Sequence, residues 1–446
     1  MTAECSTTDL LVVGAGPAGL AHAFWRLRAE PQLEVRVLEQ QAQAGGWVQT
    51  KEIDGYTCEI GPQGIRPNDD SEALLSALGI EDKVVPANPL AKHRFLARDR
   101  QLHPLPNGPG DLLATKIFTL AGKLSLCMEP FRRRRSLPDE SLAGFVARRL
   151  GPQAVPLAEA LANGVFGGDA HTLEMAAAFP AIKELETKHG SLLRGMLAGR
   201  KARQGKPKRP ALHSFCGGMH TIIQALSDSL GDRLLLSTGV VALAQEGDGW
   251  SATLANGSTM ITRELALAVP SRVAAELLGP TCRELALELK KIPFASIANV
   301  YLGYPRADVE EQLAGFGYLI DRRDASPMLG TIYCSSIFPG CAPGDEFLVR
   351  VMAGGVMRLG ALDESDDTIV QQADTMLRSY TGLSAPRVFE RVCRTPGAIP
   401  QYTLGHSQRI ARIRNRVEAL PNLHLLGNSY DAVSVVGQLR TPQSRL

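Results

Sequence analysis

One stretch, residues 9–39, constrains the fold more than any other part of the chain. An apolar run is followed by three glycines spaced G-x-G-x-x-G, a helical pattern, a second apolar run and an acidic residue. The glycines are Gly14, Gly16 and Gly19, and the acidic residue is Glu39. This order predicts a strand–helix–strand unit of a Rossmann-type α/β fold that binds a dinucleotide.

Each of these residues has a physical role in such a unit. Gly14 allows a sharp turn, Gly16 lets the backbone approach a pyrophosphate, and Gly19 lets the helix pack against the strand. The pyrophosphate is expected at the helix N-terminus, where free N–H groups and the helix dipole favour negative charge. Glu39 can accept the adenosine ribose hydroxyls. The unit alone leaves NAD and FAD open, and a glycine-rich turn in an unrelated α/β protein is the alternative.

Composition excludes several classes of protein. With 446 residues, 44% hydrophobic and 21% charged, the chain is typical of a globular protein larger than one ordinary domain. The 48 basic residues nearly balance the 46 acidic ones, so nucleic acid is not an expected partner. We expect no transmembrane helix, and a strand starting by residue 9 leaves no room for a leader peptide. The 8 cysteines and 9 histidines form no cluster, so no metal site is expected.

The pattern along the chain is discontinuous. Residues 84–106 are strand-like, residues 111–200 are helical, and strand patterns return after residue 233. Two basic runs, Arg132–Arg135 and Arg200–Arg209, belong to the helical block or lead out of it. Each run is either a solvated face with a linker or a patch that rests on anionic lipid headgroups.

Eight short motifs extend over residues 9–435. They read GAGPAGL, GGW, GPQGIRP, HRFL, NGVFGGD, GGM, GFGYL and IPQYTLGH. In this order they resemble the protoporphyrinogen oxidase family, within the amine oxidase and phytoene desaturase superfamily of flavoproteins. GAGPAGL is shared by many flavoproteins, whereas GPQGIRP, NGVFGGD and IPQYTLGH are far more specific to this family.

The resemblance implies a three-part architecture. It consists of a Rossmann-type FAD-binding domain of the p-hydroxybenzoate hydroxylase type, a β-rich substrate domain and an α-helical membrane-association domain. The implied boundaries are 1–88, 211–273 and 397–446 for the FAD-binding domain, 89–105 and 274–396 for the substrate domain, and 106–210 for the helical domain.

The resemblance also implies the chemistry. Protoporphyrinogen IX would be oxidised to protoporphyrin IX in a six-electron reaction with FAD as cofactor and O2 as acceptor, giving H2O2. Because flavin N5 would carry the chemistry, no catalytic side chain is expected. The residues implied for cofactor binding are Gly14, Ala15, Gly16, Pro17, Ala18, Gly19, Glu39, Trp47, Gly61, Pro62, Gln63, Gly64, Val240, Asn428, Val433, Ser434 and Val435. The residues implied for the tetrapyrrole are Arg94, Gly164, Phe316, Leu319, Met352 and Ile399.

Chemistry of the substrate agrees with these residue types. A large apolar macrocycle with two carboxylates calls for an apolar pocket with few placed cations, and arginine is a natural carboxylate partner. The resemblance implies that Arg94 pairs with a propionate, whereas the residues alone would favour a surface charge at this position. The family further implies peripheral attachment to a membrane, at the cytoplasmic face in bacteria or on the mitochondrial inner membrane in eukaryotes. A homodimer and handover of product to ferrochelatase are further expectations from the family.

The C-terminus departs from the family pattern. The family continues with G-V-[AS]-V-N-D-C-I and a closing helix, whereas this chain has Ala432 in place of the glycine and ends soon after Val435. A missing helix would weaken FAD binding. The sequence therefore leaves two alternatives open beside the leading reading: oxidation of coproporphyrinogen III to coproporphyrin III, and an inactive, truncated relative that binds a tetrapyrrole.

Overall fold

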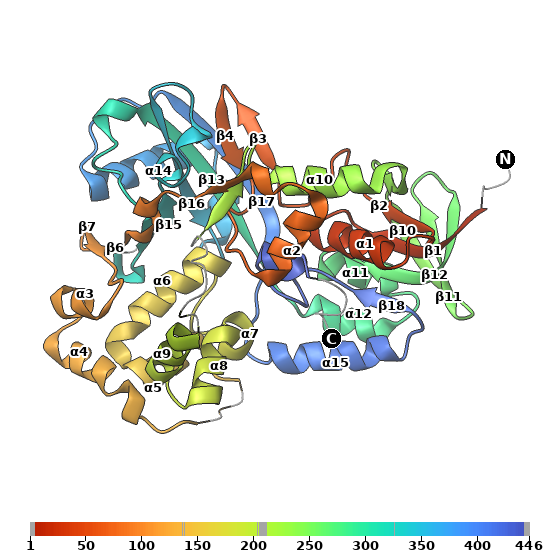
Figure 1. Cartoon of the computed structure of the whole chain (residues 1–446), viewed down its shortest axis with the longest axis horizontal. Helices are drawn as coiled ribbons and strands as arrows, with labels where there is room; N and C mark the ends of the chain where they lie inside the picture. The colour runs from red at the N-terminus through yellow and green to blue at the C-terminus, as the bar shows by residue number, and fades with distance from the viewer. Residues whose placement is uncertain are drawn as a thin grey trace.

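The chain is built around two large β-sheets, with a group of helices on one side (Figure 1). The computed structural model describes residues 5–135, 137, 139–202, 204, 212–324 and 326–440. Among these residues, the first sheet has the order β10-β11-β12-β1-β2-β9, with β18 beside β12. Its strands are β1 (Cys5–Val13), β2 (Val35–Leu38), β9 (Leu234–Leu235), β10 (Val240–Glu246), β11 (Gly249–Leu254), β12 (Thr259–Leu267) and β18 (Leu423–Leu425).

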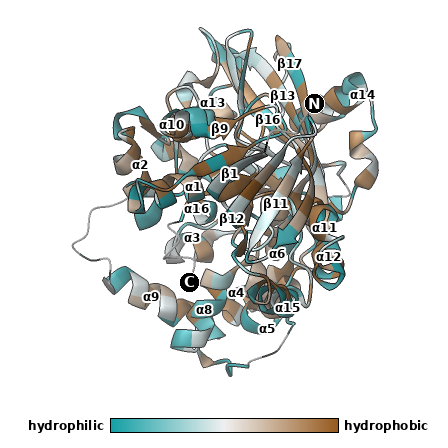
Figure 2. Cartoon of the chain, turned by 90° about the vertical axis from the view of Figure 1, so that its right-hand side faces the viewer, coloured by the Kyte–Doolittle hydropathy of each residue, from teal (hydrophilic) through white to brown (hydrophobic). Residues whose placement is uncertain are grey.

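The first sheet contains the predicted strand–helix–strand unit. Helix α1 (Pro17–Ala29) joins β1 to β2, which lie parallel, and β2 ends at Leu38 as expected. Strand β1 starts earlier than the apolar run because its first residues pair with β12, up to Cys5 opposite Thr259. Hydrophobic stretches on β1 and β12 lie in the interior (Figure 2), and the centre of β1 is fully buried. This sheet is covered by α2 (Asp69–Leu78), α10 (His220–Leu230), α11 (Ser271–Leu278), α12 (Arg283–Lys290) and α15 (His406–Glu418).

The second sheet has the order β17-β13-β16-β15-β14-β6-β7. Its strands are β6 (Arg94–Arg98), β7 (Gln101–Pro104), β13 (Phe294–Pro305), β14 (Gly317–Ile320), β15 (Met328–Ile332), β16 (Glu346–Gly354) and β17 (Phe389–Pro400). Side chains alternate between its faces, as in any strand. One face packs through Tyr304 and Val349 against α14 (Asp366–Thr381), whereas Tyr301 and Leu348 on the other face belong to the cluster that contains Tyr56.

The helical block predicted for residues 111–200 is confirmed. It contains α3 (Pro109–Ala114), α4 (Leu120–Cys127), α5 (Leu142–Leu150), α6 (Val155–Phe166), α7 (Met175–Ala178), α8 (Pro180–His189) and α9 (Leu192–Ala202). Across the described residues, no helix is both long and apolar enough to cross a membrane. Most of the second basic run, after Lys201, lies outside the described residues. The exact boundaries of the three implied domains stay a prediction.

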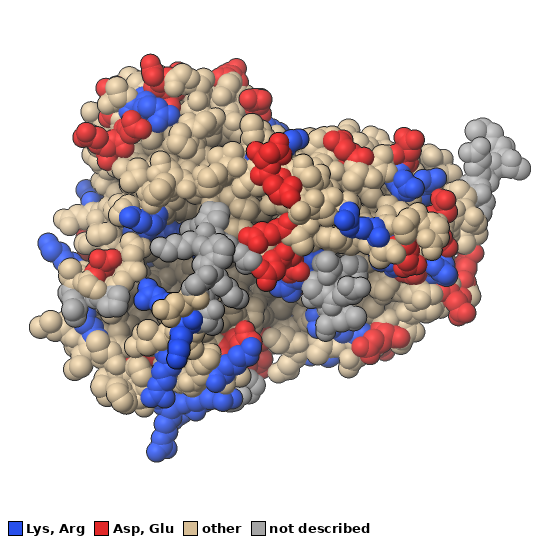
Figure 3. Space-filling model, in the orientation of Figure 1, with Lys and Arg blue, Asp and Glu red and all other residues tan. Residues whose placement is uncertain are grey.

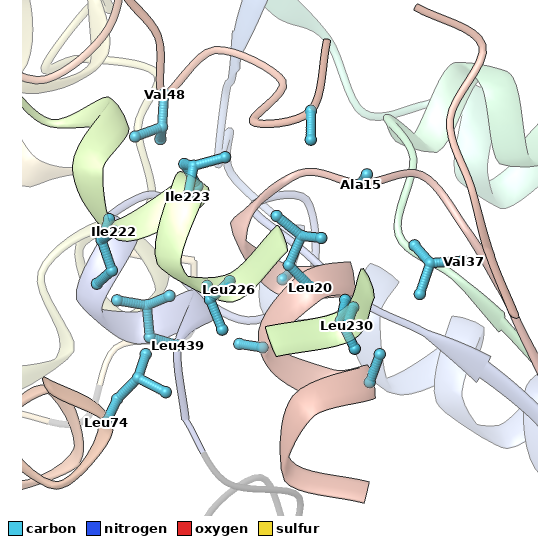
Figure 4. Packing of buried hydrophobic residues seen from close by; sticks show 14 of the residues in the cluster. Ala15, Leu20, Val37, Val48, Leu74, Ile222, Ile223, Leu226, Leu230 and Leu439 are labelled. Atoms are coloured by element: carbon cyan, nitrogen blue, oxygen red, sulfur yellow. The ribbon is translucent and has the colours of Figure 1, made fainter. Parts of the chain in front are cut away.

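The C-terminus differs from two expectations. The residues LHLLGNSY (423–430) predict a final strand by their apolar run, and that prediction is wrong beyond Leu425, because the chain turns at Gly427. Instead of lacking any helix, the tail forms one helical turn, α16 (Val435–Gln438), whose first residue follows Ser434 as N-cap. Leu439 then lies against Leu74, Ile222 and Leu226 in a buried cluster (Figure 4). The shortened tail is therefore anchored in the core of the first sheet.

Candidate functional site

The glycine loop between β1 and α1 has the geometry that a phosphate-binding turn requires. A Cβ atom on Gly14, whose φ is +101°, would lie 2.6 Å from the Ala268 carbonyl oxygen. A Cβ on Gly19 would lie 2.1 Å from the Gly14 carbonyl oxygen. By contrast, a Cβ on Gly16 would meet nothing within 4 Å. Two glycines are thus required by the fold, and the third faces open space where a phosphate can approach the backbone.

Glu39 lies at the end of β2 and faces this loop. Its Oε2 accepts a hydrogen bond from the Ala15 N–H at 2.9 Å, and its Oε1 accepts one from the Gln41 N–H at 3.0 Å. The Glu39 carbonyl accepts from Thr238 N–H at 2.7 Å, two residues before Val240. Each carboxylate oxygen retains a lone pair for a ribose hydroxyl. The predicted nucleotide residues are therefore brought together from β1, β2 and β10.

A second and a third glycine segment continue from this loop. Gly45 donates its N–H to the Ala15 carbonyl at 2.8 Å, and the nearest atom to a Cβ on Gly46 would be Gly16 Cα at 3.6 Å. A Cβ on Gly61 would lie 2.2 Å from the Trp47 carbonyl oxygen. The three segments therefore lie against one another as a cradle in which Gly16 and Gly46 have open space beside them, and this arrangement fits an extended dinucleotide such as FAD.

Three side chains of the second sheet hold the segment that leads into Gly61–Gly64. Arg350 Nη1 donates to the Gly61 carbonyl at 2.7 Å and to the Glu59 carbonyl at 3.3 Å. Asn299 Nδ2 donates to the Ile60 carbonyl at 2.9 Å, and the Tyr301 hydroxyl donates to the Glu59 carbonyl. Sequence reasoning missed these residues. The available signal was Arg350, the one arginine in the apolar strand FLVRVM. Because side chains alternate along a strand, Arg350 and Met352 lie on the same face of the sheet.

Glu59 itself carries a buried carboxyl group. It is 2% exposed, accepts from the Met219 N–H at 2.8 Å and from the Thr50 hydroxyl at 2.8 Å. Burial raises the pKa of Glu59 to about 7, against the opposing effects of these donors and of Arg350. The junction between the two sheets is thus rich in buried polar groups that are hydrogen-bonded to each other.

The C-terminal residues of the predicted cofactor site approach from the other side. The Tyr402 hydroxyl donates to the Asn428 carbonyl, and Asn428 Nδ2 donates to the Ala398 carbonyl at 3.3 Å. Val433 packs in the same apolar cluster as Ile399, and Ser434 caps the turn of α16 by accepting from the Gly437 N–H at 3.2 Å. The 428–435 segment is therefore fixed to the end of β17, next to the second sheet.

Five of the six predicted tetrapyrrole residues gather on one side of the second sheet. The Arg94 guanidinium carbon lies 4.5 Å from the centroid of the Phe316 ring. A Cβ on Gly164 would lie 2.6 Å from Leu319 Cδ2, so this glycine allows α6 to approach β14. Leu319 and Met352 both pair with Gly330, from opposite sides of β15. The result is an apolar surface with a cation at its edge.

Ile399 lies apart from the other five predicted tetrapyrrole residues. It is on β17, opposite Ala295 of β13, and it packs in the same cluster as Val433. A cavity of about 480 Å3 is lined in part by Asn163, Leu329 and Gly354, and its lining includes none of the predicted site residues. A larger cavity of about 1130 Å3 lies beside α14, at the other face of the sheet, and contains none of the predicted site residues. We place the site on the apolar side, where the cradle and the arginine meet.

Comparison with known proteins agrees with this geometry. Residues 17–441 match the family described as flavin containing amine oxidoreductase. The protoporphyrinogen oxidase of Bos taurus is 33% identical over 96% of this chain and 95% of its own length. The coproporphyrinogen III oxidase of Bacillus subtilis is 27% identical, over 96% and 95% of the two chains. A solved structure of a candidate protoporphyrinogen oxidase from Exiguobacterium sp. 255-15 has a TM-score of 0.82 and 26% identity, covering 99% of this chain and 98% of that one. The chain therefore belongs to the flavin-containing amine oxidoreductase family and, within it, to the protoporphyrinogen oxidases.

Proposed function

We propose that this enzyme oxidises protoporphyrinogen IX to protoporphyrin IX with FAD as cofactor. The observation that carries the proposal is Arg94, an exposed cation at the edge of an apolar sheet face, with no acidic partner among the described residues. An apolar macrocycle with carboxylates on one edge is the class of ligand that such a surface accepts. A primary or secondary amine, the substrate of many relatives, would gain nothing from a guanidinium at this position.

The side chains would bind and orient the substrate. Arg94 holds a propionate, while Leu319 and Met352 contact the apolar ring system and exclude water from it. When bound, FAD supplies the two-electron oxidation in each of three rounds, and O2 takes up the electrons and gives H2O2. The Gly14–Gly19 loop and Glu39 would hold its adenosine diphosphate part, and the segments 61–64 and 428–435 would contact the rest of the cofactor.

Substitution of Arg94 by alanine tests the proposal. Loss of a charge-assisted carboxylate partner raises KM for protoporphyrinogen by about tenfold to a hundredfold, with a smaller change in kcat. Arg391, an exposed arginine on β17, provides the matched control, R391A. Equal KM values for R94A and R391A would contradict the proposal.

Coproporphyrinogen III is the second candidate substrate. The Bacillus subtilis relative carries that activity in its name and covers nearly the same length. The two porphyrinogens differ in the number of carboxylates, four against two, so the number of cations at the pocket edge decides between them. Competition between the two porphyrinogens for one enzyme sample gives the ratio of kcat/KM directly.

An exposed face of the helical block suggests peripheral membrane attachment. Leu120 is 85% exposed, Phe131 74% and Met196 60%. Arg133–Arg135 and Arg200 are also exposed, and they lie close in sequence to these apolar residues. In Figure 3, Lys and Arg side chains project at the lower edge of the molecule, over this block. Apolar side chains beside basic ones favour the interface of an anionic bilayer.

Vesicle binding tests the attachment. The flavin-loaded protein should sediment with vesicles that contain anionic lipid, and the variant L120E/F131E should stay in the supernatant. A matched variant on another surface is L287E in α12, since Leu287 is 52% exposed. Equal sedimentation of all three proteins would contradict the proposal. The compartment, a homodimer and product handover to ferrochelatase stay predictions.

A further inference from the structure

Arg66 lies on a rigid segment next to the cofactor cradle. Ile65 before it exchanges backbone hydrogen bonds with His213 at 2.8 and 2.9 Å. Pro67 after it restricts its backbone to extended conformations, and Asn68 then caps α2 through a reciprocal bond with Ser71. The side chain of Arg66 is exposed. The fold therefore presents this guanidinium from a fixed backbone position.

The segments that carry Arg66 and Arg94 both pack on the short helix α13 (Cys334–Ile337) and its continuation. A Cβ on Gly64 would lie 3.3 Å from the Phe338 ring, and Asn88 N–H donates to the Ile337 carbonyl at 2.9 Å. The residues after Asn88 form the one-turn helix Pro89–Lys92, which leads directly into Arg94. Two segments that are distant in sequence thus pack on the same short helix, one just before Arg66 and the other just before Arg94.

Neither guanidinium group has an acidic partner among the described residues. The pKa of Arg94 is lowered, first by burial and then by the positive charge of Arg66. Among the described residues, neither arginine forms an ion pair or a side-chain hydrogen bond, although most other arginines at domain junctions do, such as Arg98 with Asp321 at 2.7 Å. Like charges held together without a counter-ion are unfavourable until an anion binds between them.

We propose that Arg66 and Arg94 together form a dicarboxylate site that binds both propionates of the porphyrinogen, with Arg66 taking the second. This inference rests on the proposed function. The two propionates of protoporphyrinogen IX lie on neighbouring pyrrole rings, so they leave the macrocycle at one edge and can meet two adjacent arginines. Methyl and vinyl groups on the opposite edge then point to Leu319 and Met352. Arg66 would fix the rotation of the ring in its own plane and make the pocket select substrates by their carboxylate pattern.

The test uses the flavin-loaded enzyme and a porphyrin that it cannot oxidise. Mesoporphyrin IX has the two propionates, and its dimethyl ester has the same ring without their charge. Both are titrated against wild type, R66A, R94A and the control R283A, which alters an exposed arginine on α12. Loss of one charge-assisted pair should weaken mesoporphyrin binding to R66A by about tenfold to a hundredfold. The affinity of R66A for the dimethyl ester should equal that of wild type, and R66K should recover part of the loss.

The outcomes of this experiment distinguish a failure of the dicarboxylate site from a failure of the proposed function. If R66A binds mesoporphyrin as tightly as R283A, or loses the same factor for the ester, the dicarboxylate site is wrong, whereas turnover of protoporphyrinogen by wild type would still support the proposed function. If wild type binds neither porphyrin, the dicarboxylate site is wrong, and only a failure to turn over protoporphyrinogen would also overturn the proposed function. Coproporphyrin III binding that is tighter than mesoporphyrin binding and depends on Arg66 would support the arginine pair and favour the tetracarboxylate substrate.

Discussion

Arg350 Nη1 lies 2.7 Å from the carbonyl oxygen of Gly61, a residue 289 positions away in the sequence. The arginine comes from the centre of the substrate-side sheet and is 4% exposed, while Gly61 begins the turn expected to lie against the flavin. This contact ties the two sheets together at the point where cofactor and substrate must meet. Arg350, together with Asn299 and Tyr301, therefore fixes the segment expected to lie against the flavin relative to the second sheet.

Replacing Arg350 by methionine tests this role. R350M keeps the length of the side chain but leaves the Gly61 carbonyl without its donor, which costs about 1–3 kcal/mol. We expect a lower free energy of unfolding and a lower flavin-to-protein ratio after purification, with partial recovery in R350K. R391M, on the exposed side of a nearby strand, is the control. Full flavin occupancy and unchanged stability in R350M would contradict this role.

Alanine substitutions at two glycines of the first loop should have different effects on stability and on FAD binding. G19A places a Cβ 2.1 Å from a carbonyl oxygen, so it should destabilise the fold by about 1–3 kcal/mol, even without cofactor. G16A meets no atom within 4 Å and keeps an ordinary φ of −72°, so the apoprotein should keep its Tm. Added FAD should raise the Tm of wild type but not of G16A. A normal FAD-induced shift in G16A would show that the phosphates do not approach this glycine.

The raised pKa of Glu59 predicts how the stability of the protein depends on pH. Its pKa of about 7 in the folded protein is above its ordinary value of 4.5, so between these values the folded protein binds more protons than the unfolded chain. Stability should therefore fall as pH rises from 4.5 to 7, by about 3 kcal/mol from this group. Urea unfolding at pH 5 and pH 8 measures the change. E59Q should flatten the profile, whereas E52Q, at an exposed position on β3 (Thr50–Ile53), should leave it as in wild type. Parallel profiles for E59Q and wild type would refute the assignment.

The helical block contains a buried ion pair between Arg149 and Glu129, which are 0% and 2% exposed. Glu129 also accepts from the Ser191 hydroxyl at 2.6 Å and from the Leu192 N–H at 2.9 Å, so it joins the α4 region to the start of α9. E129Q removes the nearer of two acidic partners of a buried arginine, since Glu186 Oε1 lies 3.8 Å from Arg149 Nη1. It should lower the unfolding free energy by about 3 kcal/mol.

The exposed pair of Glu184 and Lys188 supplies the contrast within the same block. E184Q should change stability by less than about 1 kcal/mol, because surface ion pairs contribute little. Urea midpoints of the two variants, measured side by side, give the comparison. A loss in E129Q as small as that in E184Q would show that the buried pair does not hold the block together.

Local sequence patterns were sufficient to predict the strand–helix–strand unit in which the expected nucleotide site lies. Gly14, Gly16, Gly19 and Glu39 lie within one strand–helix–strand unit, and their spacing alone brings them together. The helical block and the return of strands after residue 233 were equally predictable from periodicity. These features depend on neighbours along the chain, which a pattern can detect.

The junction between the sheets was not predictable in this way. Arg350, Tyr301 and Asn299 act on residues 59–61 from strands more than two hundred positions away, and only the pairing of β13 with β16 places them side by side. The anchoring of Leu439 also depends on tertiary packing, here against α2 and α10. Weaker FAD binding, the consequence expected from the C-terminal sequence, therefore stays a prediction from local pattern alone.

The most direct measurement is the absorbance spectrum of the purified protein before and after anaerobic addition of protoporphyrinogen IX. We predict about one FAD for each chain, with loss of the flavin absorbance near 450 nm on addition of the substrate and its return on admission of O2. R94A should bleach only at higher substrate concentration. A folded protein without flavin, or a flavin-loaded one whose spectrum does not change with protoporphyrinogen, would contradict the proposed function.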